Sequence, residues 1–196
     1  MKRTSYKQTA LLQVTFVTFV LLFAFCNLIQ KPAFTKVSAE ENNIAKFESN
    51  KQENDANFLV SAAEINLEEI HLGELARKNG RTTYIKELGK TMGAMHTKSL
   101  NDLTALAKSK MISIPTSLTY HAQEAYKKLN EKSGHEFDKA YTDMMVSEHK
   151  IVIATFEKIA TDGNDTDIKN WAKVTLPDFR THLDFSIDCQ KNYLRE

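Results

Sequence analysis

Four residues of types that often bind metal ions interrupt the apolar stripes of four predicted helices. Glu69, His96, His149 and His182 each occupy a position that helical spacing assigns to the buried side of its helix. A carboxylate removed from water is costly unless it is paired or coordinated. Carboxylate and imidazole groups around a dication relieve this cost together, and such ligands suit zinc, copper or iron. The pattern predicts a transition-metal site inside a helical protein.

Two further carboxylates are candidate ligands of the same site. Glu148 directly precedes His149, and Asp178 lies one helical turn before His182. Each residue alone also has a structural explanation, because single buried histidines are mostly held by hydrogen bonds and a single glutamate near a seam mostly extends to solvent. Under this alternative the inner histidines are structural, and the protein is a non-catalytic module that binds a partner or supports stress tolerance.

The order of these residues along the helix axes predicts two polar layers. Counting from the expected turns at 1.5 Å rise per residue separates Glu69 from His96 by about 9 Å along the axis. The same count separates His149 from His182 by about 6 Å.

The signature of a dinuclear iron enzyme is missing from the sequence. It requires a glutamate three residues before a histidine, on one helix face. The residues three before His96, His149 and His182 are Gly93, Val146 and Phe179. The sequence also has no glycine-rich phosphate loop, no His-Glu-x-x-His and no Cys-x-x-Cys. No pair of nucleophile and base can be named, so the sequence favours a binding protein over an enzyme.

Five helices are predicted to position the candidate ligands. They cover about residues 55–79, 82–110, 116–131, 135–160 and 166–193, and Pro177 is expected to bend the last one. The four long helices form two hairpins, which a long crossover with the short helix connects. The predicted fold is therefore all-α, a ferritin-like four-helix bundle that occupies residues 55–196.

Residues 1–39 are predicted to be a signal peptide or a membrane anchor. Residues 10–29 are apolar, basic residues stand on both sides, and the first acidic residue is Glu40. Three outcomes are open: cleavage after Ala39, lipid attachment at Cys26, or retention as an N-terminal anchor. Each exports the body, which is then periplasmic or anchored in the cell envelope, and a retained segment makes the membrane a partner.

Residues 40–54 are polar and have no apolar period, so they are expected to form a tether. Five of the 26 Lys and Arg residues precede Glu40, which leaves 21 basic and 25 acidic residues from there onward. This mildly acidic body argues against nucleic acid as a partner. Cys189 is the one cysteine after the leader, and it is expected to be a small buried side chain.

Three stretches of the predicted bundle resemble a known family. They are residues 69–76 (EIHLGELA), residues 137–141 (FDKAY), and the Leu-Pro at 176–177 followed by His182. They are similar to the exported bacterial family called domain of unknown function 4142, and the resemblance covers residues 57–183. It implies a ferritin-like fold and a location at the membrane or outside it. In this family the second helix tends to carry an Asp-His pair, whereas Met95 precedes His96 here. The resemblance implies no reaction, and it matches polar positions at Glu69, His96, Asp138, Tyr141, His149 and His182.

Overall fold

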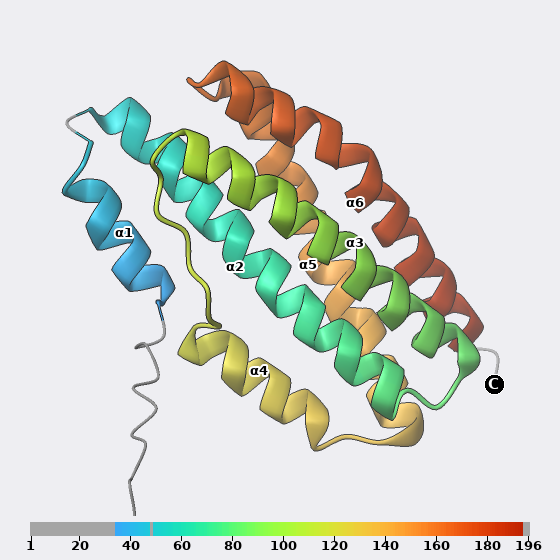
Figure 1. Ribbon diagram of the computed structural model, residues 1–196. Helices are drawn as coiled ribbons and strands as arrows, with labels where there is room; N and C mark the ends of the chain where they lie inside the picture. The colour runs from blue at the N-terminus through green and yellow to red at the C-terminus, as the bar shows by residue number, and fades with distance from the viewer. Residues whose placement is uncertain (1–33, 48, 194–196) are drawn as a thin grey trace, which may run out of the picture. The chain divides into compact units, whose positions relative to one another are not determined.

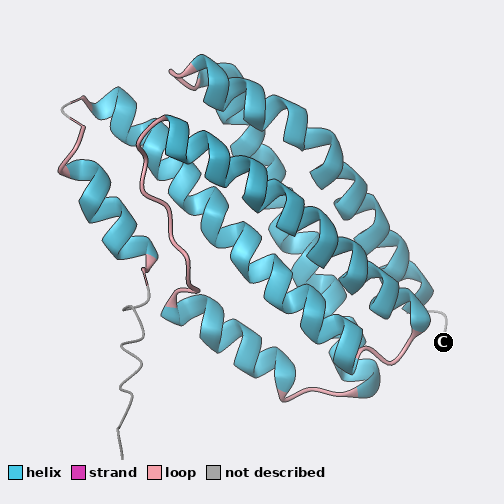
Figure 2. Cartoon of the chain, viewed as in Figure 1, coloured by secondary structure: helices cyan, strands magenta, loops and turns pink. Residues whose placement is uncertain are grey.

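The computed structural model describes residues 34–47 and 49–193, and within these ranges it contains helices and loops without a strand (Figure 2). The helices are α1 (Lys36–Ile44), α2 (Asn50–Asn79), α3 (Thr83–Ser109), α4 (Tyr120–Asn130), α5 (Gly134–Asp162) and α6 (Thr166–Tyr193). The all-α prediction is confirmed. The four long helices match their predicted ranges closely, except that α2 begins five residues earlier than expected.

The four long helices α2, α3, α5 and α6 form a bundle (Figure 1). Hydrogen bonds to two aspartates hold the ends of this bundle together. Asp138, near the start of α5, accepts hydrogen bonds from the backbone N–H groups of Arg81 at 2.8 Å and Thr82 at 3.1 Å, in the α2–α3 turn. At the other end Asp55 of α2 accepts from the backbone of Asn164 at 3.1 Å and Asp165 at 2.7 Å. These contacts make α3 and α5 parallel, which is the ferritin-like arrangement with one long crossover.

The crossover returns from the end of α3 to the opposite end of the bundle, alongside α2, and includes α4 (Figure 1). At its beginning, Lys110 forms ion pairs with Asp165 at 2.7 Å and Asp167 at 2.6 Å. This fixes the end of α3 against the α5–α6 turn. The crossover therefore starts from a position that the neighbouring hairpin defines.

The stretch predicted as a polar tether contains helical structure instead. Helix α1 packs beside α2 (Figure 1), with Ala39 fully buried. The buried Asn43 donates to the carbonyl oxygen of Ser113 at 2.9 Å and accepts from its N–H at 2.8 Å. The tether prediction for residues 40–54 is wrong in its local structure, because these hydrogen bonds to the crossover replace an apolar stripe. The predicted boundary after Ala39 falls inside α1.

Helix α6 continues through Pro177, although proline removes one backbone hydrogen bond. The leader prediction concerns residues that lie mostly outside the described ranges. Within residues 34–47 and 49–193, no helix combines the length and the apolar character needed to cross a membrane.

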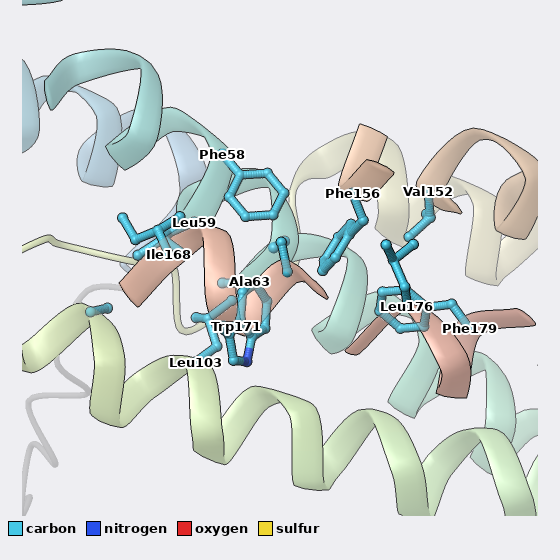
Figure 3. Close-up of a cluster of buried hydrophobic side chains, with 13 residues drawn as sticks. Phe58, Leu59, Ala63, Leu103, Val152, Phe156, Ile168, Trp171, Leu176 and Phe179 are labelled. Atoms are coloured by element: carbon cyan, nitrogen blue, oxygen red, sulfur yellow. The ribbon is translucent and has the colours of Figure 1, made fainter. Parts of the chain in front are cut away.

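The buried apolar side chains form two clusters with a polar layer between them. One cluster, drawn in Figure 3, gathers around Phe156, whose ring centroid lies 4.9 Å from that of Phe58 and 4.8 Å from that of Phe179. The other contains Met92, Met145 and Cys189. On all four long helices the residues between these clusters include a buried polar side chain, namely Asn66, Glu69, His96, His149 and His182.

Candidate metal centre

Three of the four predicted ligands meet in the polar layer. His96 of α3, His149 of α5 and His182 of α6 each offer one ring nitrogen, and these three atoms lie within 4.8 Å of one another. Each side chain is 1% exposed. Among the described residues this is the group whose composition and spacing could hold a metal ion.

A hydrogen bond to Asn66 sets the tautomer of His96. The amide nitrogen of Asn66 donates to the carbonyl oxygen of Ala62 at 2.8 Å, so its Oδ1 faces the ring. Oδ1 can only accept, and His96 Nδ1 lies 3.0 Å from it, so Nδ1 carries the proton. His96 Nε2 is then unprotonated and carries a lone pair, and it has no hydrogen-bond partner within the described residues. The hydrogen bond to Asn66 therefore leaves Nε2 as the nitrogen of His96 that is available to a metal ion.

The backbone of α5 orients His149 in the same way. Its Nδ1 lies 3.0 Å from the carbonyl oxygen of Met145, which can only accept, so Nδ1 is the protonated nitrogen. The Nε2 lone pair faces His182 Nδ1 at 3.3 Å. A tetrahedral ion with metal–nitrogen bonds of about 2.0–2.1 Å holds its ligand nitrogens about 3.3 Å apart. This pair of histidines already has that separation.

Met95 supports the third histidine. His182 Nε2 lies 3.2 Å from the sulfur of Met95, which is a weak hydrogen-bond acceptor. When Nε2–H donates to this sulfur, His182 Nδ1 presents its lone pair on the side of His149. All three imidazoles can therefore direct a lone pair inward while the other nitrogen donates a hydrogen bond outward.

Burial keeps the three imidazoles neutral. Desolvation lowers the pKa of His149 and of His182 to about 4, and the neighbouring His182 acts in the same direction on His149. Desolvation, together with the other two histidines, places the pKa of His96 well below its ordinary value. Neutral imidazole is the form that binds metal ions, so the group is ready to accept one at neutral pH.

Glu69 lies beside the histidine group and outside it. Its Oε1 is 3.7 Å from His149 Nδ1, the nitrogen that bonds to the backbone of α5, whereas His182 contacts Nε2 of the same ring. Glu69 is 1% exposed, and no backbone, hydroxyl or amide donor of the described residues reaches its carboxyl oxygens, so its polar neighbour is the carboxyl group of Glu148, with which it can share a proton. Desolvation and the charge of Glu148 raise its pKa well above the ordinary value.

The two extra candidate ligands are also separate from the histidines. Glu148 is half-buried on α5 and adjoins Glu69, and Asp178 is half-buried on α6. Neither belongs to the group of three histidines. The structure thus brings together three of the six residues that the sequence proposed.

The expectation of two polar layers is wrong for the histidines, because it counts backbone positions only. Side chains on a helix lean toward its N-terminus. In each antiparallel hairpin this brings the two side chains toward a common level. His182 consequently reaches His149, although the backbone count separates these two residues by about 6 Å along the axis. His96 lies at the same level and joins them in one group.

Sequence reasoning missed Asn66 as part of this layer. It lies four residues after Ala62 and three before Glu69, both of them buried, so helical spacing could have identified it. Asp138 and Tyr141 are both buried, and the Tyr141 hydroxyl has no hydrogen-bond partner within the described residues. Cys189 is 2% exposed as expected, and the remaining histidines are exposed, namely His71, His121 and His135.

Replacing Glu148 with glutamine is expected to stabilise the protein at alkaline pH. Desolvation and the charge of Glu68 raise the pKa of Glu148 to about 7. Between pH 4.5 and 7 the folded state therefore binds more protons than the unfolded state, so the free energy of unfolding falls as the pH rises through this window. At pH 8 Glu148→Gln should raise the free energy of unfolding by about 1–3 kcal/mol, and the gain should shrink toward pH 5.

Urea unfolding of both proteins at pH 8 and pH 5 measures this difference. The exposed Glu74 of α2 provides a control, since replacing a solvent-facing side chain by glutamine should leave the free energy of unfolding nearly unchanged. A Glu148→Gln protein that is less stable than wild type at pH 8 would contradict the assigned cost of burying this carboxylate.

The fold defines the class of protein, and a family comparison places the chain within it. The described chain is a helical bundle with one long crossover and a buried histidine group. The chain belongs to the family described as Domain of unknown function (DUF4142), whose model matches residues 41–185. Neither a search of the curated proteins nor a search of the solved structures finds a match.

Proposed function

We propose that this protein holds one transition-metal ion at His96, His149 and His182. The observation that carries the proposal is the arrangement of the three rings, each with a lone pair available inward and a hydrogen bond on the other nitrogen. Histidines that bind metal ions nearly always donate the second ring N–H to a carbonyl, a carboxylate or water. Here the acceptors are the side chain of Asn66, the backbone at Met145 and the sulfur of Met95.

The ligands favour an ion of the zinc, copper or iron(II) type. Imidazole nitrogen suits these metals, whereas magnesium and calcium prefer oxygen. The three ligand atoms lie within 4.8 Å, so His96 must approach the other two by roughly 1 to 1.5 Å to complete a tetrahedral arrangement. Burial of each histidine to 1% exposure favours holding an ion over converting a substrate. The proposed role is therefore binding, without catalysis.

The proposed location is the cell envelope. It is supported by the leader of the sequence, in which an apolar stretch at residues 10–29 follows basic residues and precedes the first acidic one. A metal-binding bundle that is exported or anchored there would buffer or store an ion outside the cytoplasm.

A structural role for the histidines is the competing function. His182 Nδ1 can donate to His149 Nε2 at 3.3 Å, which closes a hydrogen-bond network without a metal ion. Such a network predicts that thermal unfolding is insensitive to chelators. Metal binding predicts that chelators lower the unfolding temperature of the loaded protein.

Titration of the metal-free full-length chain with Co²⁺ tests the proposal. We expect one equivalent to bind, with the visible absorption of a four-coordinate site, and we expect His149→Ala and His182→Ala to abolish this binding. His71→Ala, at an exposed histidine, should leave it unchanged. Absence of a stoichiometric metal, or full retention in both variants, would rule the site out.

A further inference from the structure

The histidine group is closed to solvent, so an ion requires a route to it. A pocket with a volume of about 180 Å³ lies between α2 and α5. We call it the acidic pocket. Its lining consists of Ile65, Glu68, Glu69, Glu148, Ile151 and Val152.

The acidic pocket adjoins the histidine group through one side chain. Glu69 lines the pocket and is 1% exposed, and its Oε1 lies 3.7 Å from His149 Nδ1. No backbone, hydroxyl or amide donor of the described residues reaches the oxygens of this carboxyl group, and its polar neighbour is the carboxyl group of Glu148. Two adjacent carboxyl groups out of water are costly when both are ionised, and a cation or a proton between them relieves that cost. Glu69 thus offers a carboxyl oxygen to the pocket and lies next to His149.

The remaining lining suits the temporary binding of a cation. Glu68 and Glu148 are half-buried, so they can contact both solvent and Glu69. The apolar walls reduce the dielectric around the three carboxylates, and negative charge in such a cleft attracts cations. The side chain of Ile151 is 65% exposed, which places the pocket mouth at the surface of α5.

We propose that the acidic pocket is the port through which a divalent cation enters the protein. The cation binds first to the carboxylates of Glu68, Glu69 and Glu148, and then passes His149 to reach the three histidines. This inference rests on the proposed function, because it assigns the route to that same metal site. It makes Glu148 a residue of the route and excludes it from the final coordination shell.

A port has a distinctive kinetic signature. Damage to it slows arrival and departure by the same factor, because the ion crosses the same place in both directions and the final site is unchanged. Loss of a final ligand raises the dissociation rate and weakens equilibrium binding. Comparison of both rate constants with the dissociation constant therefore separates the two roles.

Stopped-flow uptake of Co²⁺ by the full-length chain at pH 8, and its release to a chelator, tests the port. We expect Glu148→Gln to slow association and dissociation at least tenfold each, with the equilibrium dissociation constant changed less than threefold. Glu74→Gln, on α2 and outside the acidic pocket, should leave both rates at the wild-type values. An unchanged association rate in Glu148→Gln, or faster dissociation with weaker binding, would overturn the port.

A second variant tests whether the cation passes through the acidic pocket, without any change of charge. Ile151→Trp fills the mouth of the pocket and should also slow both rates while preserving the equilibrium constant. Normal rates in this variant would overturn the route. Failure of the wild-type protein to bind Co²⁺ would remove the proposed function itself, whereas wild-type binding with unaltered rates in both variants would remove only the port.

Discussion

Replacing Gly73 with alanine is expected to lower the free energy of unfolding by about 3 kcal/mol. Helices α2 and α3 are in backbone contact at this glycine. A Cβ atom on Gly73 would lie 2.6 Å from the carbonyl oxygen of Gly89 and 2.9 Å from the backbone nitrogen of Gly93. Backbone atoms cannot rotate away, so α2 and α3 must separate.

Gly93→Ala is the matched control on the facing helix. A Cβ atom there would meet nothing within 4 Å. Alanine is a better helix former than glycine, so this variant should gain about 0.5–1 kcal/mol. Urea unfolding measures both changes. Equal stability of the two variants would show that the helices do not approach as closely as described.

The same substitution should weaken metal binding. Asn66 on α2 holds His96 on α3 at 3.0 Å, and this bond crosses the interface that Gly73→Ala widens. The contact between Gly73 and Gly89 thus determines the distance between α2 and α3. Through the hydrogen bond from His96 to Asn66, it also determines the orientation of the His96 ring.

Metal affinity is expected to be almost independent of pH between 7.5 and 5.5. Because the pKa of His149 and of His182 is lowered to about 4, chiefly by desolvation, and that of His96 lies well below its ordinary value, protons compete with the ion only in more acidic solution. Three histidines with an ordinary pKa of about 6.5 would lose about 1,000-fold in affinity over this range. We expect a change of less than about threefold.

Equilibrium dialysis of Co²⁺ at several pH values measures this profile. It also tests the position of Glu69. Burial and the neighbouring Glu148 raise the pKa of this carboxyl group well above its ordinary value, so as a metal ligand it would make the affinity fall as the pH is lowered. At an ion concentration 1,000-fold above the dissociation constant, binding should add about 4 kcal/mol to the free energy of unfolding. A steep loss of affinity near pH 6.5 would contradict the buried site.

The apo protein should behave differently over the same range. Because desolvation lowers the pKa of His149 and His182, the unfolded state binds more protons than the folded state between pH 6.5 and 4. The histidines therefore contribute stability that is present above pH 6.5 and is lost as the pH falls toward 4. The raised pKa of Glu148 acts in the opposite direction, so the Glu148→Gln protein should show the larger loss on acidification.

Helical spacing predicted the bundle because each long helix buries a regular apolar stripe. The interruptions at His96, His149 and His182 were visible for the same reason. Helix α1 could not be found in this way, since hydrogen bonds between Asn43 and Ser113, 70 residues apart, hold it in place. Local sequence does not encode a partner at that distance.

The separation of Glu69 from the three histidines could not be predicted from the sequence, because it depends on the orientation of the histidine rings. Glu69 and His149 both interrupt a stripe, yet the carboxyl group meets the protonated edge of the ring. Spacing along a helix identifies which residues face inward. It does not identify which nitrogen of a histidine faces which neighbour, and that choice separates a ligand from a residue of the acidic pocket.

The three histidines come from both hairpins of the bundle. His96 comes from the α2–α3 hairpin, and His149 and His182 come from the α5–α6 hairpin. An ion bound to all three would cross-link the two halves of the chain and oppose their separation, as a reversible staple does. Local opening of one hairpin would then require release of the ion, so amide hydrogen exchange in α3 and α6 should slow together when metal is added. Binding of an ion at this internal site would therefore make the two hairpins unfold together, as one cooperative unit.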